Sequence, residues 1–453
     1  MTELASVPRR THPLSPFAKA GQGLSGLVLA VFVVARDVPG GFVSRLGLVA
    51  LLLIAAAVLG WVSWWRTTFW FDDDGDLRIA SGLFYRNERR LQLSRLQSVE
   101  ITRPLVARLV GLAEVRPEVA GGENAKIALA YLSEDEAMAM RAELLARAAG
   151  VRGGHADAPV PEERPLIRVP PTDLAISMVM NHWVIIGAVV GLGFLAVALA
   201  TGRIGGFVAF VFTSGLPGLS LVTGYLAYYD FTVAESADGL RLRSGLLSTR
   251  AQTVPPGRVQ AVSISQTLLW RWKGWVKVQL NVAGSGGHEG NDGSTGTKGG
   301  VILLPVAPVA VAYGLLNRVL PGVDVPGIAL AAAPRAARKR APWQFNQLAG
   351  GADASVFVAR GGWLTRRLDV LPHARTQSVR VTQGPWQRLL GLATTHVDST
   401  PGPVAPAAKH RGATEARAIA EAQAVLAGAA RAAFRPERWA VRPEEPAQPG
   451  EPA

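Results

Sequence analysis

Residues that could perform acid–base, nucleophilic or metal chemistry are few and scattered in this sequence of 453 residues. No two of the seven histidines have metal-ligand spacing on one element, and neither a Gly-x-Ser-x-Gly elbow nor a phosphate-binding P-loop occurs. Cysteine is absent, which excludes disulfides, zinc–thiolate sites and cysteine nucleophiles. We therefore expect no enzyme activity, no bound metal and no cofactor.

Three short motifs look like ligand sites by their letters alone. Gly21–Gly26 matches the Gly-x-Gly-x-x-Gly dinucleotide pattern, but it follows no strand and opens an apolar segment, which favours close helix packing. The aspartates at 72–74 could bind a cation, whereas the neighbouring Gly75 favours a solvated hairpin tip. Asn181 and His182 stand at the start of an apolar segment, either as interfacial hydrogen-bonding residues or as a proton relay.

Arginines in three comparable stretches form a more suggestive pattern. Held near an anionic leaflet, each could gain ~1 kcal/mol of binding free energy; the alternative is a solvated strand face that follows the positive-inside rule. The candidate contacts to anionic lipid or to a partner are Arg86, Arg89, Arg90, Arg241, Arg243, Arg250, Arg366 and Arg367. A linker run, Arg338-Lys339-Arg340, allows the same two interpretations.

The overall charge also favours anionic partners. Lys and Arg number 47 against 34 Asp and Glu, a net charge of +13, while the hydrophobic fraction is 49%. Aromatic interleaving typical of a nucleic-acid platform is not evident, so we expect no nucleic acid.

The arginine stretches belong to three copies of one spaced motif. In each copy a glycine precedes the arginine of an Arg-x-Gln-x-Val run by 13 residues, and a second glycine follows that arginine by 16 residues. The motif residues are Gly82, Arg95, Gln97 and Gly111; Gly245, Arg258, Gln260 and Gly274; and Gly362, Arg375, Gln377 and Gly391. The repeated arginines could bind an anion, but recurrence at one position favours pairing with a carboxylate or capping of a strand.

Each copy is expected to fold as a small α+β module. The first glycine permits a positive φ in a tight hairpin, and the Arg-x-Gln-x-Val-x-Ile/Val stretch alternates like a strand whose last two apolar residues reach the core. A helix closes each module, beginning near Ser133, Ala307 and Ala413. Leucines ahead of the second glycine are expected to pack under the sheet as a short helical turn: Leu105 and Leu109, Leu268 and Leu269, and Leu389 and Leu390.

Four uncharged apolar stretches indicate two membrane hairpins. Leu46–Trp65 is long enough, at ~1.5 Å per residue, to cross a ~30 Å hydrocarbon core, whereas Ala20–Ala35 is shorter and spans only marginally. Ile176–Ala200 and Ile204–Tyr229 form the second pair, with a kink expected at Pro217. Buried core helices of a soluble protein are the alternative that these lengths disfavour.

Lysines and arginines set the expected orientation. They gather where the chain enters and leaves the hairpins, which places both termini and all soluble segments in the cytoplasm. No small-residue cleavage site follows the first apolar run, so we interpret it as a retained anchor.

The three motifs and two hairpins resemble the bacterial pleckstrin-homology family of the second type (bPH2), in its longer, YdbT-like form. The matching residues are the first glycines, the three Arg-x-Gln-x-Val runs, and the Gly-Leu pairs at 111 and 391; the middle copy has Trp275 after its second glycine. The resemblance implies a curved sheet or partly open β-barrel capped by a C-terminal helix in each module. It also implies a smaller membrane protein with a single module as partner, and no catalytic role.

The sequence therefore predicts a multi-pass α-helical membrane protein with three pleckstrin-homology-like modules. The predicted order is an N-terminal cytoplasmic tail (1–19), hairpin 1 (20–65), module 1 (66–150), a linker (151–174), hairpin 2 (175–229), module 2 (230–322) with a Gly-rich insertion (284–300), a basic linker (323–350), module 3 (351–434) and a disordered tail (435–453).

The predicted function is that of a non-catalytic scaffold in the cell membrane. Its modules are expected to bind a membrane-protein partner, with anionic lipid head groups as a further ligand. The alternative is a transporter or lipid-handling protein that acts through the hairpins, using Asn181, His182 and the kink at Pro217. Convergence of polar side chains on a cavity in the membrane segments would favour that alternative.

Overall fold

The computed structural model divides into two compact units, Met1–Val160 with Leu247–Gln252, and Pro161–Leu246 with Thr253–Ala453. The structure describes residues 9–10, 13, 15, 47, 50–51, 54, 58, 61–62, 64–72, 76–81, 87–93, 96–103, 105–119, 129–148, 164–202, 205–206, 210, 216–236, 239–254, 257–283 and 300–433. Most of hairpin 1, Gly82, Arg86, Arg95, the aspartates 73–74, the insertion 284–299 and the tail 435–453 lie outside the described residues.

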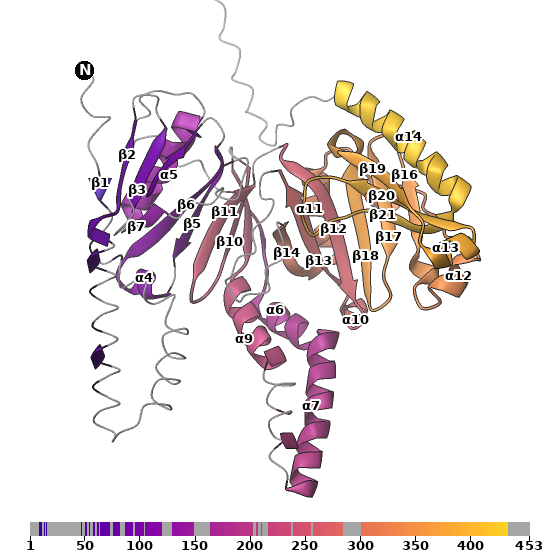
Figure 1. Ribbon diagram of the computed structural model, residues 1–453, viewed down its shortest axis with the longest axis horizontal. Helices are drawn as coiled ribbons and strands as arrows, with labels where there is room; N and C mark the ends of the chain where they lie inside the picture. Colours follow the sequence, from indigo (N-terminus) through magenta and orange to yellow (C-terminus); the bar gives the residue numbers. More distant parts are fainter. Residues whose placement is uncertain are drawn as a thin grey trace, which may run out of the picture. The chain divides into compact units, whose positions relative to one another are not determined.

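Unit 1 holds two antiparallel sheets together with the helices α4 and α5 (Figure 1). The first sheet has the order β1-β2-β3-β4, and the second contains β7-β6-β5, with β5 also paired to β11. The strands are β1 (Arg9–Arg10), β2 (Thr68–Phe71), β3 (Leu77–Ser81), β4 (Asn87–Leu91), β5 (Leu96–Arg103), β6 (Leu112–Val119), β7 (Leu129–Ser133) and β11 (Thr249–Val254). The helices are α4 (Leu105–Leu109) and α5 (Glu134–Ala148).

Helix α5 closes the core of unit 1, as expected for the first module. Ser133 Oγ accepts a hydrogen bond from the backbone N–H of Glu136, while the Glu136 carboxylate accepts one from the N–H of Ser133. This capping box fixes the start of the helix, and Leu144 on its inner side is buried with Phe69 and Val99. The predicted helix at Ser133 is confirmed.

Unit 2 contains three groups of antiparallel strands. These are β10-β9-β8, a seven-stranded sheet β14-β13-β12-β18-β17-β16-β15, and a three-stranded sheet β19-β20-β21. The strands are β8 (Arg164–Arg168), β9 (Thr232–Ser236), β10 (Gly239–Ser244), β12 (Val259–Thr267), β13 (Trp275–Val282), β14 (Gly300–Pro308), β15 (Ala331–Ala332), β16 (Ala349–Ala352), β17 (Val356–Gly361), β18 (Thr365–Pro372), β19 (Ser378–Thr382), β20 (Leu392–Asp398) and β21 (Ala407–Gly412).

Helices of unit 2 close the modules or join them. The α-helices are α6 (Pro171–Val179), α7 (His182–Thr201), α9 (Leu216–Tyr228), α10 (Trp270–Lys273), α11 (Val309–Val319), α12 (Ala337–Arg340), α13 (Pro385–Leu389) and α14 (Ala413–Ala432), and the 3₁₀ turns are η3 (Val325–Gly327), η4 (Phe345–Gln347) and η5 (His373–Arg375). Helices α11 and α14 begin where the closing helices of the second and third modules were expected. Mixed α+β modules with antiparallel sheets are thereby confirmed.

Strand β12 is buried on both faces. Val262 and Ile264 pack in one core with residues of β13 and α11, as the alternation predicts. Ala261, on the opposite face, packs with Phe357 and Leu371 in a second core that belongs to the strands and helix of module 3. The sequence did not indicate this second burial, which arises because one sheet serves two modules.

The helices of the second predicted hairpin differ from the prediction in one respect. The helix expected over Ile176–Ala200 is broken, because α6 ends at Val179 and α7 starts at His182. Asn181 caps α7 by accepting a hydrogen bond from the N–H of Trp183 at 3.1 Å, which explains the new start. The prediction of one continuous helix over Ile176–Ala200 was therefore wrong.

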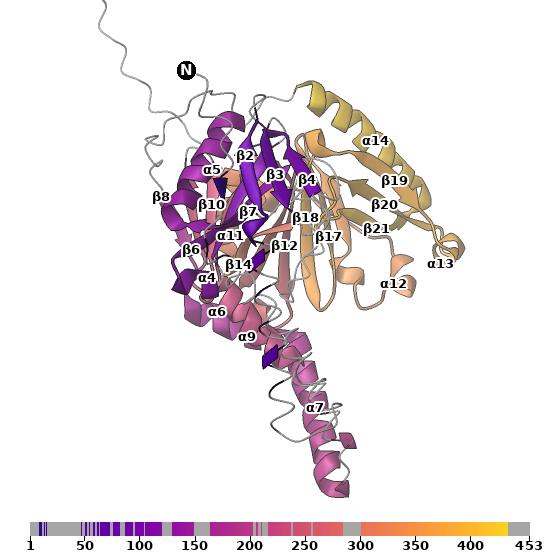
Figure 2. The ribbon, with the colours of Figure 1, turned by 60° about the vertical axis from the view of Figure 1, so that its left-hand side comes forward.

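Helix α7 extends away from the strands of unit 2 (Figures 1 and 2). Among the described residues it alone is long and apolar enough to cross a bilayer, and only 11% of its most apolar window is buried. Ile204–Tyr229 is described only in part: α9 covers 216–228, and residues 211–215 ahead of Pro217 lie outside the described ones.

The repeated glycines adopt the backbone conformation that their spacing predicts. Gly245 and Gly362 have φ of 111° and 91°, and both connect hairpin strands, β10 to β11 and β17 to β18. Gly111, Gly274 and Gly391 have φ of 68°, 64° and 64° and end the short helices α4, α10 and α13. The positive φ predicted for the first glycine of each motif is confirmed for Gly245 and Gly362, the two of these glycines that the structure describes.

The short helices do not pack wholly under the sheet, contrary to the prediction. Leu109 and Leu389 are each 79% exposed, and Leu268 is 40% exposed. The left-handed glycine that follows turns the chain back toward the sheet and leaves the last helical turn outside.

Two predicted linkers also contain regular structure. Strand β8 and the start of α6 fall in the stretch 151–174, and β15, α12 and part of β16 fall in the stretch 323–350. Strand β15 extends the seven-stranded sheet by pairing with β16. The division of the chain into the predicted domains stays a prediction.

Replacing Gly362 by alanine is expected to destabilise unit 2. A Cβ there would overlap the carbonyl oxygen of Thr365, and its φ lies in the left-handed region. Such strain lowers the free energy of unfolding by roughly 1–3 kcal/mol. Because each kcal/mol shifts the melting temperature by about 2–4 °C, we expect a melting temperature several degrees lower for Gly362→Ala. Gly361→Ala is the matched control, because its Cβ would meet only Leu348 at 3.8 Å. Equal melting temperatures for the two variants in detergent would contradict this assignment.

Candidate functional site

The strand that carries the repeated motif is covered by a hairpin strand of the next module. In unit 1, β5 pairs with β11, which follows it by more than a hundred residues. In unit 2, β12 pairs with β18 of module 3. Antiparallel pairing between successive modules therefore occurs twice.

The two pairings have the same register. Ile101 lies six residues after Arg95 and faces Ala251, six residues after Gly245. Ile264 lies six residues after Arg258 and faces Leu368, six residues after Gly362. Because both pairs match, the junction is a repeated interaction with a fixed alignment and not two separate accidents of packing.

One polar pair lies at the centre of the second junction. Ser263 of β12 donates a hydrogen bond to Oδ1 of its register partner Asp369 at 2.6 Å. Burial raises the pKa of Asp369, while the hydroxyl of Ser263 and the charges of Arg367 and Lys409 act in the opposite direction. The hydrogen bond offsets part of the cost of burying this carboxyl.

The third motif strand lacks such a cover within the described residues. Among the described strands, β19 pairs with β20 alone and ends the three-stranded sheet. Its five residues are exposed except for Val379, which is partly buried against the core around Phe357. One edge of β19 is therefore left uncovered by the described strands and could accept further backbone hydrogen bonds.

A complementary open edge exists in unit 1. Strand β4 follows the first hairpin, as β11 and β18 follow the second and third, but it pairs only with β3 among the described strands. Its residues Glu88, Arg89 and Arg90 are exposed. The three-stranded sheet and the four-stranded sheet thus correspond to the two halves that are joined in the seven-stranded sheet.

Among the residues that the structure describes, the motif arginines and glutamines of the second and third copies do not converge on a ligand site. Arg375 Nη2 donates to the carbonyl oxygen of Gly257 at 2.5 Å, at the entrance of β12. Arg258 is partly buried, which lowers its pKa, and its carbonyl accepts a hydrogen bond from the buried Gln260 at 3.3 Å. The exposed Gln377 donates its backbone N–H to Asp398. The contact of Arg375 fits the strand-capping role.

The first group of basic residues is not a single patch. Arg90 Nε lies 2.9 Å from Asp76 and 3.7 Å from Asp72, so its charge is balanced within the module. Arg89 is the next residue of the same strand and therefore points to the other face. Burial acts to raise the pKa of Asp72, but its hydrogen bonds with Arg78 and Asp76 and the charge of Arg90 lower it overall. Asp72 is thus a structural carboxylate of the turn.

The other basic residues are likewise spread over different surroundings. Arg241 is buried and Arg243 is exposed, both on β10, while Arg250 is exposed on β11. Arg366 lies near Arg271, whose pKa is lowered first by burial and then by that neighbouring charge. The exposed Arg367 donates to the carbonyl of Pro403 at 3.4 Å.

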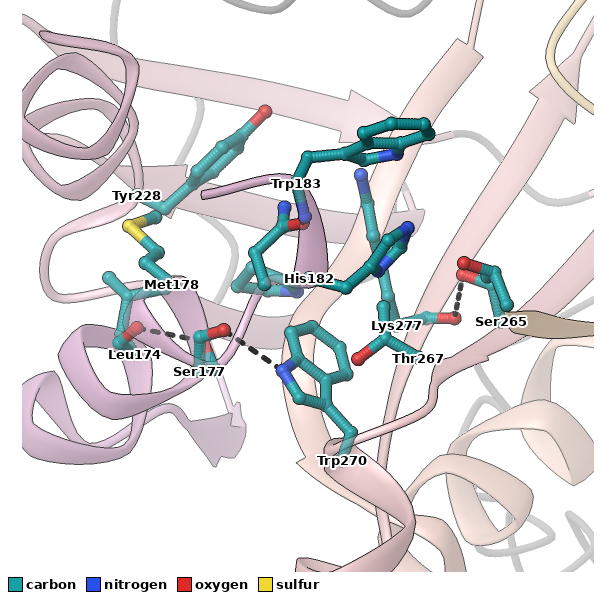
Figure 3. Close-up of a pocket in the computed structure, with 13 residues that line it drawn as sticks. Leu174, Ser177, Met178, His182, Trp183, Tyr228, Ser265, Thr267, Trp270 and Lys277 are labelled. Carbon is teal, nitrogen blue, oxygen red and sulfur yellow. Dashed lines mark hydrogen bonds between the residues drawn. The ribbon is translucent and has the colours of Figure 1, made fainter. Parts of the chain in front are cut away.

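A cavity of about 270 Å³ lies beside the start of α7 (Figure 3). Its wall includes His182, Thr267 and Lys277, and Trp270 donates its ring N–H to the carbonyl of Ser177 at 2.9 Å. Burial, and then the charge of Arg367, lower the pKa of Lys277. In the part of the chain that the structure describes, its amine has no hydrogen-bond or ion-pair partner, so the cavity could hold a small anionic group.

Chained modules of this kind, each with a hairpin sheet, a motif strand and a closing helix, define a pleckstrin-homology-like protein. Residues 25–148, 183–320 and 301–433 match the family model of the bacterial PH domain (bPH_2). The chain belongs to this bacterial PH domain family, which confirms the resemblance that the repeated glycines and arginines indicate.

One curated relative supports the same assignment. The chain is 24% identical over 338 residues to the UPF0699 transmembrane protein YdbT of Bacillus subtilis (strain 168). The aligned region covers 64% of this chain and 66% of that relative, so the chain spans just under two thirds of the relative's length. No solved structure gives a significant match.

The particular strands with open edges, and Lys277, were not singled out from sequence. The repeat itself carries the signal for those strands, because β5 and β12 pair with the next module's hairpin strand, whereas β19 and β4 have no such partner among the described strands. Lys277 carries no such signal, because a lysine in a strand gives no indication of the cavity beside it.

Proposed function

We propose that this protein is a non-catalytic scaffold embedded in the cell membrane by several helices, with its modules in the cytoplasm. The proposed partner is a smaller membrane protein that carries one module of the same family. Anionic lipid head groups are the second proposed ligand.

The open edge of β19 is the observation that supports this proposal most strongly. The motif strands β5 and β12 each receive a hairpin strand from the following module, whereas β19 pairs only with β20 among the described strands. Strand addition to such an edge provides main-chain hydrogen bonds as well as side-chain contacts. A single module on another polypeptide has the hairpin that fits this edge.

The charges at the two open edges argue against self-assembly. In the shared register, the position of Ser263 in β12 corresponds to Arg380 in β19, and the position of Asp369 in β18 corresponds to Arg89 in β4. Pairing β19 with β4 of a second copy would therefore place two arginines opposite each other, which is unfavourable although Asp398 of β20 already pairs with Arg380 at 2.8 Å. The favoured hairpin strand carries an acidic or neutral residue opposite Arg380.

A charged substitution on β19 is expected to release the partner. Val381→Lys adds a cation to the open edge at an exposed position and should abolish capture of a protein with a PH-like module from membranes of the native host in mild detergent. Val425→Lys on α14 is the matched control, since Val425 is 73% exposed and lies outside β19, and it should capture the partner as wild type does. Bound proteins and lipids are identified by mass spectrometry.

Two results would overturn this assignment. Equal capture by Val381→Lys and Val425→Lys would exclude the β19 edge as the binding site. Capture of lipid alone by the wild-type chain, with no stoichiometric membrane protein, would exclude the scaffold function.

Reversing the charge at position 89 is expected to create self-association. Arg89 is exposed, and Arg89→Glu would place a carboxylate opposite Arg380 of a second copy in the shared register. We expect oligomers of Arg89→Glu in detergent by analytical ultracentrifugation, fewer for Arg89→Gln, and none for the double variant Arg89→Glu/Arg380→Glu. Identical mass distributions for wild type and all three variants would contradict the inferred register.

The cavity beside α7 favours one second candidate function, lipid handling through the membrane helices. It combines Asn181 and His182 with the amine of Lys277. In the partner-capture experiment, the double variant Asn181→Ala/His182→Ala separates the two functions. A scaffold retains its partner in this variant, whereas a lipid-handling protein loses bound lipid.

A further inference from the structure

The three short helices share a basic residue followed by a large exposed apolar one. The pairs are Arg108-Leu109, Arg271-Trp272 and Arg388-Leu389, and in each the apolar residue lies 14 residues after the motif arginine and two before the second glycine. Leu109 is 79% exposed, Trp272 84% and Leu389 79%. A feature that recurs at one position in three diverged modules indicates a common role.

The exposure of the apolar residue in each pair follows from the local backbone geometry. The glycine after each pair has a positive φ and turns the chain directly into the next strand. The helix is too short to fold its last turn back onto the sheet, so the apolar side chain stays outside. Large apolar side chains exposed in this way mark contact surfaces.

In unit 2, the tip of α10 lies at the base of α7. Trp270 is tied to α6 by its hydrogen bond to Ser177, five residues before the first residue of α7. Trp272 follows two residues later and points outward. A side chain beside the start of a membrane-crossing helix lies at the level of the head groups.

More exposed aromatic residues continue this surface within unit 2. Arg271 donates to the carbonyl of Trp363, and the ring of Trp363 lies 5.0 Å from that of Trp343. Trp343 is 70% exposed and Trp386, on α13, 69%. We call the four segments 268–274, 335–348, 361–367 and 383–391 the interfacial belt.

The belt carries positive charge only. All four segments contain Arg or Lys, and none contains Asp or Glu. Tryptophan beside lysine and arginine is the composition of a protein surface at a membrane–water boundary, where the rings sit among head groups and the cations attract anionic lipids. A surface for a protein partner would not need to exclude acidic residues.

We propose that the interfacial belt of unit 2 lies in the head-group layer of an anionic bilayer, the same bilayer that α7 crosses. This inference rests on the proposed membrane embedding. It assigns lipid contact to the ends of the short helices α10 and α13, and not to the hairpin arginines, several of which are paired or buried. Trp272 and Leu389 insert, and the adjacent basic residues contact the phosphates.

The absence of cysteine from the chain permits a direct test. Single cysteines at Trp272→Cys, Trp386→Cys, Leu389→Cys and Val425→Cys are labelled with an environment-sensitive fluorophore in the full chain. Each is reconstituted into vesicles of phosphatidylcholine, with or without phosphatidylglycerol, that contain nitroxide-labelled lipid. Val425 is the control, because it is 73% exposed on α14, which lies toward the opposite end of unit 2 from α7 (Figures 1 and 2).

We expect blue-shifted emission and several-fold stronger nitroxide quenching at positions 272, 386 and 389 than at 425, with more quenching when phosphatidylglycerol is present. Quenching no stronger than at 425 overturns the belt, and equal quenching in both lipid mixtures overturns its anionic preference. Because no partner protein is present, failure here leaves the β19 proposal standing. Likewise, failure of the partner-capture experiment would not affect the quenching result.

Discussion

Antiparallel pairing between one module's motif strand and the next module's hairpin holds this chain together. At the β12–β18 junction it places Val262 and Ala261 of a single strand in two different cores. The strand can therefore tolerate polar residues only where they are satisfied, as Ser263 is by Asp369. The same alignment at β5 and β11 shows that the junction is a property of the repeat.

The open edges and the charges follow from that constraint. Among the described strands, β19 is the motif strand and β4 the hairpin strand that lack this pairing. Exposed edges invite association, and in the shared register Arg380 of one copy would face Arg89 of another. Under the proposal, a partner strand with an acidic or neutral residue at that position avoids this repulsion.

Much of each module could be predicted from the sequence, because its signals are local. Gly245 and Gly362 adopt positive φ where the spacing requires a tight turn, and Ser133 caps its helix with Glu136. The exposed short helices were missed, since an apolar residue such as Leu389 reads equally as buried or as membrane-facing when its surroundings are unknown. The double burial of β12 depends on a strand more than a hundred residues away, which no local pattern reveals.

Hydrogen exchange of the purified chain in detergent, without a partner, is the most direct test of whether the edge of β19 is open. We expect slow exchange for the β12 peptide around Val262, which is paired on both sides, and early deuterium uptake at the outward amides of β19 around Val381. Addition of the captured partner should then slow exchange in β19. Protection of β19 equal to that of β12 in the isolated chain would show that the edge of β19 is already covered, and would contradict strand addition at this edge.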